Sequence, residues 1–120
     1  LALAESIGAQ TMVIGVSAVD YSGYPDCRPE YIDAYRTMAN LATKKGVEDQ
    51  PFSILTPLIE LSKAQTVALG LELGVDYGQT ISCYQATHAK PACGSCESCL
   101  LRAEGFAAVN AIDPLVTFNG

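Results

Sequence analysis

Short apolar runs alternate with amphipathic segments along the chain, and this pattern predicts alternating strands and helices. Residues 11–17 (TMVIGVS) and 51–55 (PFSIL) are typical of strands buried on both faces of a parallel sheet. Between them, Pro29 suits the first turn of a helix and Gly46 suits its end. Apolar side chains recur on one face of that helix at Tyr31, Ala34, Tyr35, Met38, Leu41 and Ala42.

Helical spacing also marks the segments 1–7, 63–73 and 97–110. Ser62 and Gln65 have the spacing of a capping box at the start of the second segment, whereas Gly70 inside it is unfavourable for a helix. Gly8 and Gly74 suit the ends of the first two segments, because glycine adopts positive φ angles readily. In the tail, 112–120, Asp-Pro indicates a turn, which a short strand could follow. The alternation favours an α/β domain with a parallel sheet.

The composition indicates a globular domain with an acidic surface. The chain has 120 residues, of which 49% are hydrophobic, and a formal net charge of −6. This length favours one compact domain, and no apolar run is long enough to span a bilayer, so we predict no membrane partner. The acidic balance argues against direct nucleic-acid binding, although the seven Lys and Arg residues could still bind a small anionic ligand.

The first ten residues, LALAESIGAQ, predict a cytoplasmic protein and a chain that starts inside a helix. They lack the basic start, apolar core and cleavage site of a secretory signal. No capping residue stands before Leu1, so we expect this sequence to be a piece of a longer protein. If so, the face that packs on the remaining part should be apolar, which would also allow a homo-oligomer.

Four of the five cysteines fall within one short stretch and predict a metal site. Their spacing is Cys83-x9-Cys93-x2-Cys96-x2-Cys99. Two residues between thiolates let both sulfur atoms face one centre, and Gly94 permits the tight backbone turn that this needs. Four thiolates complete a tetrahedral zinc site with no open position, so the predicted zinc is structural, with one ion per chain.

Other uses of these cysteines remain open. An iron–sulfur cluster also uses C-x2-C-x2-C, but the usual run continues with a further Cys and a Pro, where this chain has Leu100 and Leu101. His88 could replace one cysteine as a ligand, although it also suits a solvated loop. Disulfide pairing is disfavoured by the odd cysteine count and the missing signal peptide.

Cys27 lies apart from this group, in YPDCRPE. A neighbouring arginine and a nearby helix start would both lower the pKa of its thiol, which suits a nucleophile. No histidine stands near it in the sequence to act as a base, so a small packed residue is the alternative.

Three stretches together resemble the 7-cyano-7-deazaguanine synthases of queuosine biosynthesis: VDYSGYPDCRPEYIDAY at 19–35, TPLIELSKAQTVALGLELGVDY at 56–77 and SCY…ACGSCESCLLRAEGF at 82–106. The resemblance covers nearly the whole chain. It implies a Rossmann-like parallel sheet of the PP-loop, adenine nucleotide α-hydrolase-like fold. Residues 1–120 would then be the C-terminal part of one such domain, with a zinc-binding subregion at 82–110.

The same resemblance implies a reaction and its partners. Such synthases would use ATP, together with Mg²⁺, to convert 7-carboxy-7-deazaguanine and ammonia into the nitrile 7-cyano-7-deazaguanine, which makes them carbon–nitrogen ligases. The S-G-G-x-D-S loop that would hold the ATP pyrophosphate is absent from this sequence. We therefore expect the ATP-binding part to lie outside this chain, and the chain alone to be inactive.

Candidate catalytic residues lie in the loop after the first predicted strand, because open α/β sheets place ligand contacts at the carboxyl ends of strands. The loop carries Asp20, Tyr21, Tyr24, Asp26 and Arg28. The fork of Arg28 suits the substrate carboxylate or a phosphate. Asp20 or Asp26 could hydrogen-bond the purine-like base or transfer a proton, although either carboxylate could instead cap a turn or helix. The tyrosines could equally be packing residues.

Three further side chains are candidates near the two later helices. Lys63 lies at a helix start, where a cation is unfavourable unless it contacts an anion such as a phosphate, and a solvated lysine is the alternative. Arg102 could bind an anion, but we expect it to pair with Glu97 or Glu104. Tyr84 could shield the metal or face the substrate.

Two other functions are compatible with these features. One is a stand-alone, zinc-stabilised interaction module, which would need a capped N-terminus. The other is a different PP-loop enzyme, such as a tRNA thiolation protein that uses its cysteines catalytically. That enzyme would favour a basic RNA-binding surface, whereas this chain is acidic.

Overall fold

The computed structural model of the chain describes residues 1–19, 24–88 and 90–115. The chain divides into two compact units, Leu1–Glu60 and Leu61–Gly120. Helices accompany a two-stranded parallel sheet, which confirms the predicted α/β class. Among the described residues, no helix combines the length and apolar character needed to cross a bilayer.

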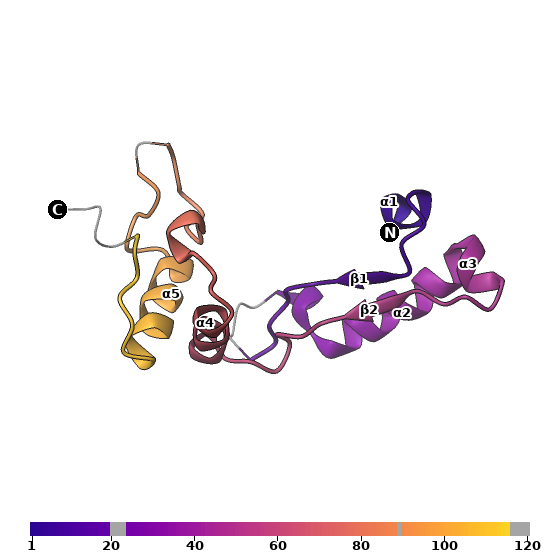
Figure 1. The fold of residues 1–120 in the computed structure, drawn as a ribbon, viewed down its shortest axis with the longest axis horizontal. Helices are drawn as coiled ribbons and strands as arrows, with labels where there is room; N and C mark the ends of the chain where they lie inside the picture. Colours follow the sequence, from indigo (N-terminus) through magenta and orange to yellow (C-terminus); the bar gives the residue numbers. More distant parts are fainter. Residues whose placement is uncertain (20–23, 89, 116–120) are drawn as a thin grey trace. The chain divides into compact units, whose positions relative to one another are not determined.

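The first unit is built around a parallel strand pair that is joined through a helix (Figure 1). Its elements are α1 (Ala2–Ser6), β1 (Thr11–Val13), η1 (Pro25–Cys27), α2 (Pro29–Ala42), α3 (Lys44–Val47) and β2 (Ser53–Leu55). In the sheet, Met12 pairs with Ile54 and Val13 with Leu55. The helix α1 ends before Gly8, whose φ of 75° confirms its predicted role as a terminator.

Both strands are shorter than the apolar runs predict, and Pro57 explains why. The register continues to Ile14, whose N–H donates to the carbonyl of Leu55 over 2.9 Å. The next bond of a parallel ladder would need an N–H from residue 57, and proline has none. The paired ladder therefore stops, although the amide of Ala18 still bonds to the carbonyl of Ile59.

The core of the first unit lies between α2 and the strands. Ile32, Ala39 and Ile54 are 1%, 0% and 3% exposed and form one apolar cluster. Partly buried side chains surround them: Leu1, Met12, Ile14, Val16, Tyr35 and Ile59. Beside this cluster, Arg36 donates two hydrogen bonds to the carbonyl of Ile54, and the side chain of Asn40 accepts from the amide of Phe52. Polar side chains thus join α2 to the segment that carries β2.

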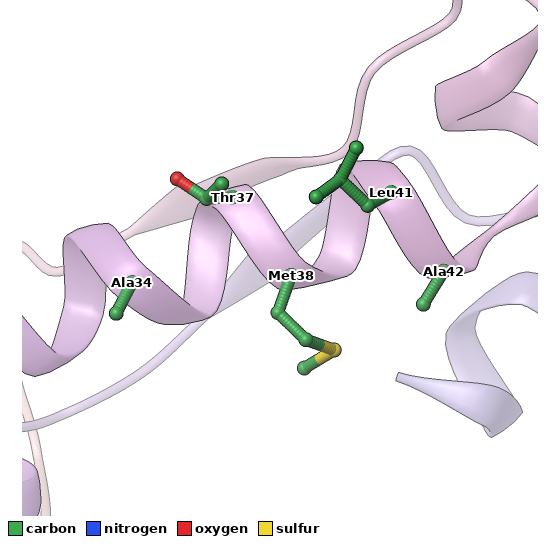
Figure 2. Close-up of a pocket in the computed structure, with 5 residues that line it drawn as sticks. All are labelled: Ala34, Thr37, Met38, Leu41 and Ala42. Carbon is green, nitrogen blue, oxygen red and sulfur yellow. The ribbon is translucent and has the colours of Figure 1, made fainter.

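The apolar face that the sequence marks on α2 is mostly not the buried one. Tyr31, Met38 and Leu41, which we call the outward face, are 43%, 43% and 75% exposed. Figure 2 shows a hollow on this side of α2, lined by Ala34, Thr37, Met38, Leu41 and Ala42. Because α2 carries apolar residues on two sides, spacing alone does not identify the side that meets the sheet.

The predicted end of the long helix at Gly46 is wrong, because the helix ends at Ala42. Thr43 adopts an extended conformation, with φ −107° and ψ 149°. Its buried hydroxyl donates to the carbonyl of Ala39 and accepts from the amide of Gly46, so one side chain ends α2 and caps α3. Gly46 therefore lies inside the second, shorter helix.

The second unit contains two packed helices, α4 (Lys63–Glu72) and α5 (Glu97–Ala108), with the short helix η2 (Tyr77–Gln79) between them in sequence. The predicted capping box is confirmed: Ser62 accepts from the amide of Gln65, whose side chain accepts from the amide of Ser62. Val67 and Phe106, each 3% exposed, belong to the core of this unit. In the tail, residues 112–115 form no strand, and residues 116–120 lie outside the described part.

Gly70, which is unfavourable in the sequence, is required by packing. It is buried, and a Cβ placed on it would overlap the hydroxyl of Tyr77. That hydroxyl donates to the carbonyls of Thr66 and Val67 over 3.1 and 3.3 Å, and the Tyr77 ring contacts Phe106 edge-on. Tyr77 therefore connects η2 to both helices of the unit, and Gly70, which has no Cβ, leaves space for the Tyr77 hydroxyl.

Gly70→Ala should destabilise the second unit by roughly 1–3 kcal/mol, because the added methyl group displaces Tyr77. The measurement is thermal or denaturant unfolding of the metal-loaded chain. Tyr77→Leu in the same chain removes the obstructing hydroxyl, so Gly70→Ala should cost less in that background. An equal cost in both backgrounds would contradict the contact.

Replacing Met38 and Leu41 with lysine should reduce the binding of a hydrophobic dye and leave the free energy of unfolding nearly unchanged. Both side chains project into solvent, so little packing is lost. The matched control is Ile32→Ala in the same helix, which should cost about 2–5 kcal/mol because Ile32 is buried. Unchanged dye fluorescence in the double lysine variant would show that the dye binds elsewhere.

Candidate metal centre

The second unit brings the four clustered cysteines together. Cys83 follows η2, Cys93 lies in the next loop, Cys96 is the N-cap of α5 and Cys99 lies in its first turn. Their sulfur atoms all lie within 4.8 Å of one another, and those of Cys93 and Cys99 are 3.9 Å apart. In a tetrahedral site with Zn–S bonds of roughly 2.3 Å, neighbouring sulfur atoms lie about 3.8 Å apart. The four thiols therefore have the spacing of ligands to one ion.

Backbone amides orient two of these sulfur atoms. Cys93 Sγ accepts from the amides of Ser95 and Cys96 at 3.5 and 3.3 Å, and the hydroxyl of Ser95 lies 3.6 Å away. Cys83 Sγ accepts from the amides of Gln85 and Cys93 at 3.3 and 3.4 Å. Gly94 has a φ of 75°, which turns the chain tightly enough for these amides to face the sulfur, as the sequence predicts.

These surroundings give the thiols different acidities. Hydrogen bonds from Ser95, first from its amide and then from its hydroxyl, lower the pKa of Cys93 to about 5, with a further contribution from the amide of Cys96. Backbone hydrogen bonds from Cys99 and Tyr84 lower the pKa of Cys96. Burial raises the pKa of Cys99 to about 11. The site thus combines thiols that ionise readily with one that ionises fully only when a cation binds.

The donor set fits a resident metal ion with a structural role. All four cysteines are free thiols, so no disulfide competes with metal binding among them. Four sulfur ligands fill a tetrahedral coordination sphere and leave no position for a substrate, which is compatible with structural zinc. His88 is exposed and does not belong to the group, so it replaces none of the four.

The other candidate residues are spread over both units. Asp20 and Tyr21 lie outside the described residues. Asp26 lies in η1 and Arg28 directly follows it, with its Nε donating to the carbonyl of Pro25 over 3.1 Å. Both side chains are exposed, as is Tyr24. Cys27 in the same short helix is half-buried, and Tyr84 beside Cys83 is 65% exposed.

Lys63 and Arg102 belong to the second unit and are less solvated than a surface cation. Lys63 is half-buried, and its carbon chain passes Gly105 of α5. Arg102 is 7% exposed and pairs with Asp113, with Nε 2.6 Å from Oδ2. The predicted pairing with Glu97 or Glu104 is therefore wrong. The actual partner lies beyond the end of α5, where helical spacing gives no signal for it.

Ser95 also contributes to the site, although neither its residue type nor its spacing by itself predicts this role. Its amide and hydroxyl both donate to Cys93. The signal that could have found it is its place between Gly94 and Cys96, because the residue after the glycine of a C-x2-C turn directs its amide toward the first cysteine.

Zinc binding at pH 7 should release fewer than four protons, and the affinity should rise with pH. Cys93 has already lost its proton at pH 7, since its pKa is about 5, whereas Cys99 keeps its proton until metal binds, since its pKa is about 11. Calorimetry in buffers with different heats of ionisation counts the released protons.

Two variants serve as controls for this proton count. Ser95→Ala removes the hydroxyl donor and raises the pKa of Cys93, so this thiol keeps its proton to a higher pH and zinc binding there should release more protons than in the unmodified chain. Cys27→Ser lies outside the group and should change nothing. Release of four protons by the unmodified chain at pH 7 would contradict an ionised Cys93.

Comparison with known proteins identifies the family. The model of the family described as "Queuosine biosynthesis protein QueC" matches residues 1–110. Proteins named 7-cyano-7-deazaguanine synthase from Dechloromonas aromatica and Acinetobacter baylyi are 62% and 60% identical over 114 residues, and one from Psychrobacter cryohalolentis is 64% identical. Each alignment covers 95% of this chain but only 51%, 50% and 44% of the relative, so the chain spans about half the length of these proteins. The chain belongs to the QueC family of queuosine biosynthesis proteins.

Proposed function

We propose that this chain acts as part of a 7-cyano-7-deazaguanine synthase. The observation that carries the proposal is 60–64% identity to proteins of that name over 95% of the chain. This identity favours a synthase over an interaction module or a tRNA thiolation protein. The activity belongs to a polypeptide of about twice this length, because the chain spans about half of each relative.

The proposed reaction is the ATP-dependent conversion of 7-carboxy-7-deazaguanine and ammonia into the nitrile. A carboxylate becomes a useful electrophile only when one of its oxygen atoms is made a good leaving group, and ATP supplies that activation. Ammonia then displaces the activated oxygen and forms an amide. Activation of the amide oxygen in the same way lets it leave with its activating group while the nitrogen loses both protons, which gives the nitrile. ATP with Mg²⁺ would bind to a PP-loop that this sequence lacks, in a Rossmann-like sheet that β1 and β2 would extend.

Within this reaction, the segment after β1 supplies the proposed substrate contacts. Arg28 binds a carboxylate or phosphate through its guanidinium fork. Asp20 or Asp26 bonds to the deazaguanine base or carries a proton. Exposure supports these roles for Asp26 and Arg28, since neither is buried within its own unit. Lys63 is proposed to contact a phosphate, and its position as the first residue of α4 supports this role.

The ion at the cysteine centre is proposed to be zinc. Sulfur atoms within 4.8 Å of one another leave space for one ion, whereas a cluster of several iron atoms needs more room between its ligands. The zinc would stabilise the second unit rather than react. We also propose that the protein is cytoplasmic, acts on small-molecule substrates and makes no direct contact with nucleic acid. The exposed outward face of α2 would allow a homo-oligomer.

A chimera tests the proposed function. This chain replaces the corresponding half of the Dechloromonas aromatica relative, and formation of the nitrile is followed by mass spectrometry. We expect product only when 7-carboxy-7-deazaguanine, ammonia and ATP are all present, and none from this chain alone. Cys96→Ser in the chimera should reduce the yield of folded, active protein, because one metal ligand is lost.

The outcome that contradicts the proposal is equally specific. If the chimera folds and contains one metal ion per chain, and the unmodified relative is active beside it, absence of nitrile would show that this chain serves a different reaction. Nitrile formation by this chain alone would instead contradict the need for a separate ATP-binding part.

A further inference from the structure

Arg102 makes more contacts than an ion pair requires. Its guanidinium has five N–H donors, and all five find acceptors. Nε and Nη2 donate to the two carboxylate oxygen atoms of Asp113 at 2.6 and 2.8 Å. Nη2 also donates to the carbonyl of Tyr77 at 3.0 Å, and Nη1 donates to the carbonyl and hydroxyl of Thr80, both at 2.9 Å. No N–H of this side chain remains for an anionic ligand.

The acceptors of Arg102 lie on the segment that leads to Cys83. Tyr77 and Thr80 precede this cysteine, and Thr80 is only three residues from it. Arg102 itself lies on α5, three residues after Cys99 and therefore about one turn further along the same side of the helix. Its side chain thus connects the segment that carries one sulfur ligand to the helix that carries another.

A second contact joins the same two parts of the chain. The hydroxyl of Ser98 on α5 donates to the carbonyl of Ser82 at 2.7 Å, directly before Cys83. Cys93, Cys96 and Cys99 lie within seven consecutive residues, whereas Cys83 is separated from them by a longer loop. Among the four, Cys83 is therefore the ligand whose position depends most on contacts outside the cysteine turn itself.

The surroundings of Arg102 strengthen this connection. The side chains of Arg102 and Asp113 are 9% and 7% exposed. The guanidinium carbon lies 5.4 Å from the centre of the Phe106 ring and 6.0 Å from that of Tyr77. Hydrogen bonds that are shielded from water hold their geometry more firmly than exposed ones. Asp113 supplies the opposite charge without which a buried guanidinium would be unfavourable.

We infer that Arg102 is a positioning residue for the metal centre and acts through Cys83. It holds the Tyr77–Cys83 segment against α5, so that the sulfur of Cys83 already lies beside the other three when metal arrives. The inference rests on the metal centre of the proposed function. A lysine cannot replace Arg102, because its single ammonium group cannot reach Asp113, Thr80 and Tyr77 together.

Arg102→Lys tests the inference through the metal, without an activity assay. We expect zinc affinity, measured by competition with a coloured chelator, to fall by about 10–100-fold, the usual effect of losing a residue that orients a ligand. Cobalt bound to Arg102→Lys should show weaker thiolate-to-metal charge-transfer absorption than cobalt bound to the unmodified chain, similar to that of Cys83→Ser. The matched control is Arg36→Lys: Arg36 also donates to a backbone carbonyl, but in the other unit, so affinity and spectrum should stay unchanged.

A double-mutant cycle separates positioning from general destabilisation. If Arg102 acts through Cys83, then Arg102→Lys should cost little further affinity in a Cys83→Ser chain and its full cost in a Cys96→Ser chain. Ser98→Ala provides a second route if Arg102→Lys fails to fold. Ser98→Ala removes the neighbouring contact without disturbing the buried ion pair. It should lower zinc affinity several-fold, and this loss should likewise be small in a Cys83→Ser chain.

The outcomes are distinct. A four-thiolate cobalt spectrum with unchanged zinc affinity in Arg102→Lys overturns the inference and leaves the metal centre intact. An equal loss of affinity with and without Cys83 also overturns it, because the effect would then be general. If the unmodified chain binds neither zinc nor cobalt, the metal centre itself fails and the inference fails with it.

Discussion

Repulsion between closely spaced thiolates is the constraint on which the second unit depends. Two unit charges about 4 Å apart near a protein surface repel by roughly 4 kcal/mol at an effective dielectric constant of 20. Four sulfur atoms within 4.8 Å of one another would accumulate several such penalties if they were all ionised. A divalent cation among them attracts every thiolate and so outweighs their mutual repulsion, and the geometry of the loop and the binding of a metal therefore favour each other. Amide donors to Cys93 and Cys83 ease the same problem in part, because they place positive partial charge beside sulfur.

Each unit has a small apolar core, and the two units are stabilised by different additional contacts. The first unit buries few side chains completely, and α2 is joined to the strand segment through Arg36 and Asn40 as well as through Ile32 and Ala39. The second unit uses directional contacts: Tyr77 fills the space above Gly70, and Arg102 links three stretches of backbone. Apolar area alone is a weak source of stability at this size, so polar contacts and a metal ion matter more than they would in a larger domain.

The sequence predicted the features that arise from local chemistry. The capping box at Ser62, the positive φ of Gly94 and the grouping of four cysteines each depend on a few neighbouring residues, and all are confirmed. Features that depend on distant contacts were missed. The spacing of α2 did not reveal that Ile32 would be buried and Leu41 exposed, and nothing local linked Arg102 to Asp113. The early end of α2 was missed because the Thr43 hydroxyl, rather than a glycine, ends the helix.

The outward face of α2 also affects how copies of this chain behave in solution. Tyr31, Met38 and Leu41 place apolar surface in water, which favours contact between copies, while a net charge of −6 keeps the copies apart. The second effect acts over a Debye length, which shrinks from about 10 Å at 0.1 M salt to about 3 Å at 1 M. The colloidal state of the chain is therefore a balance between short-range attraction and screened repulsion, and ionic strength, rather than folding, sets which of the two dominates.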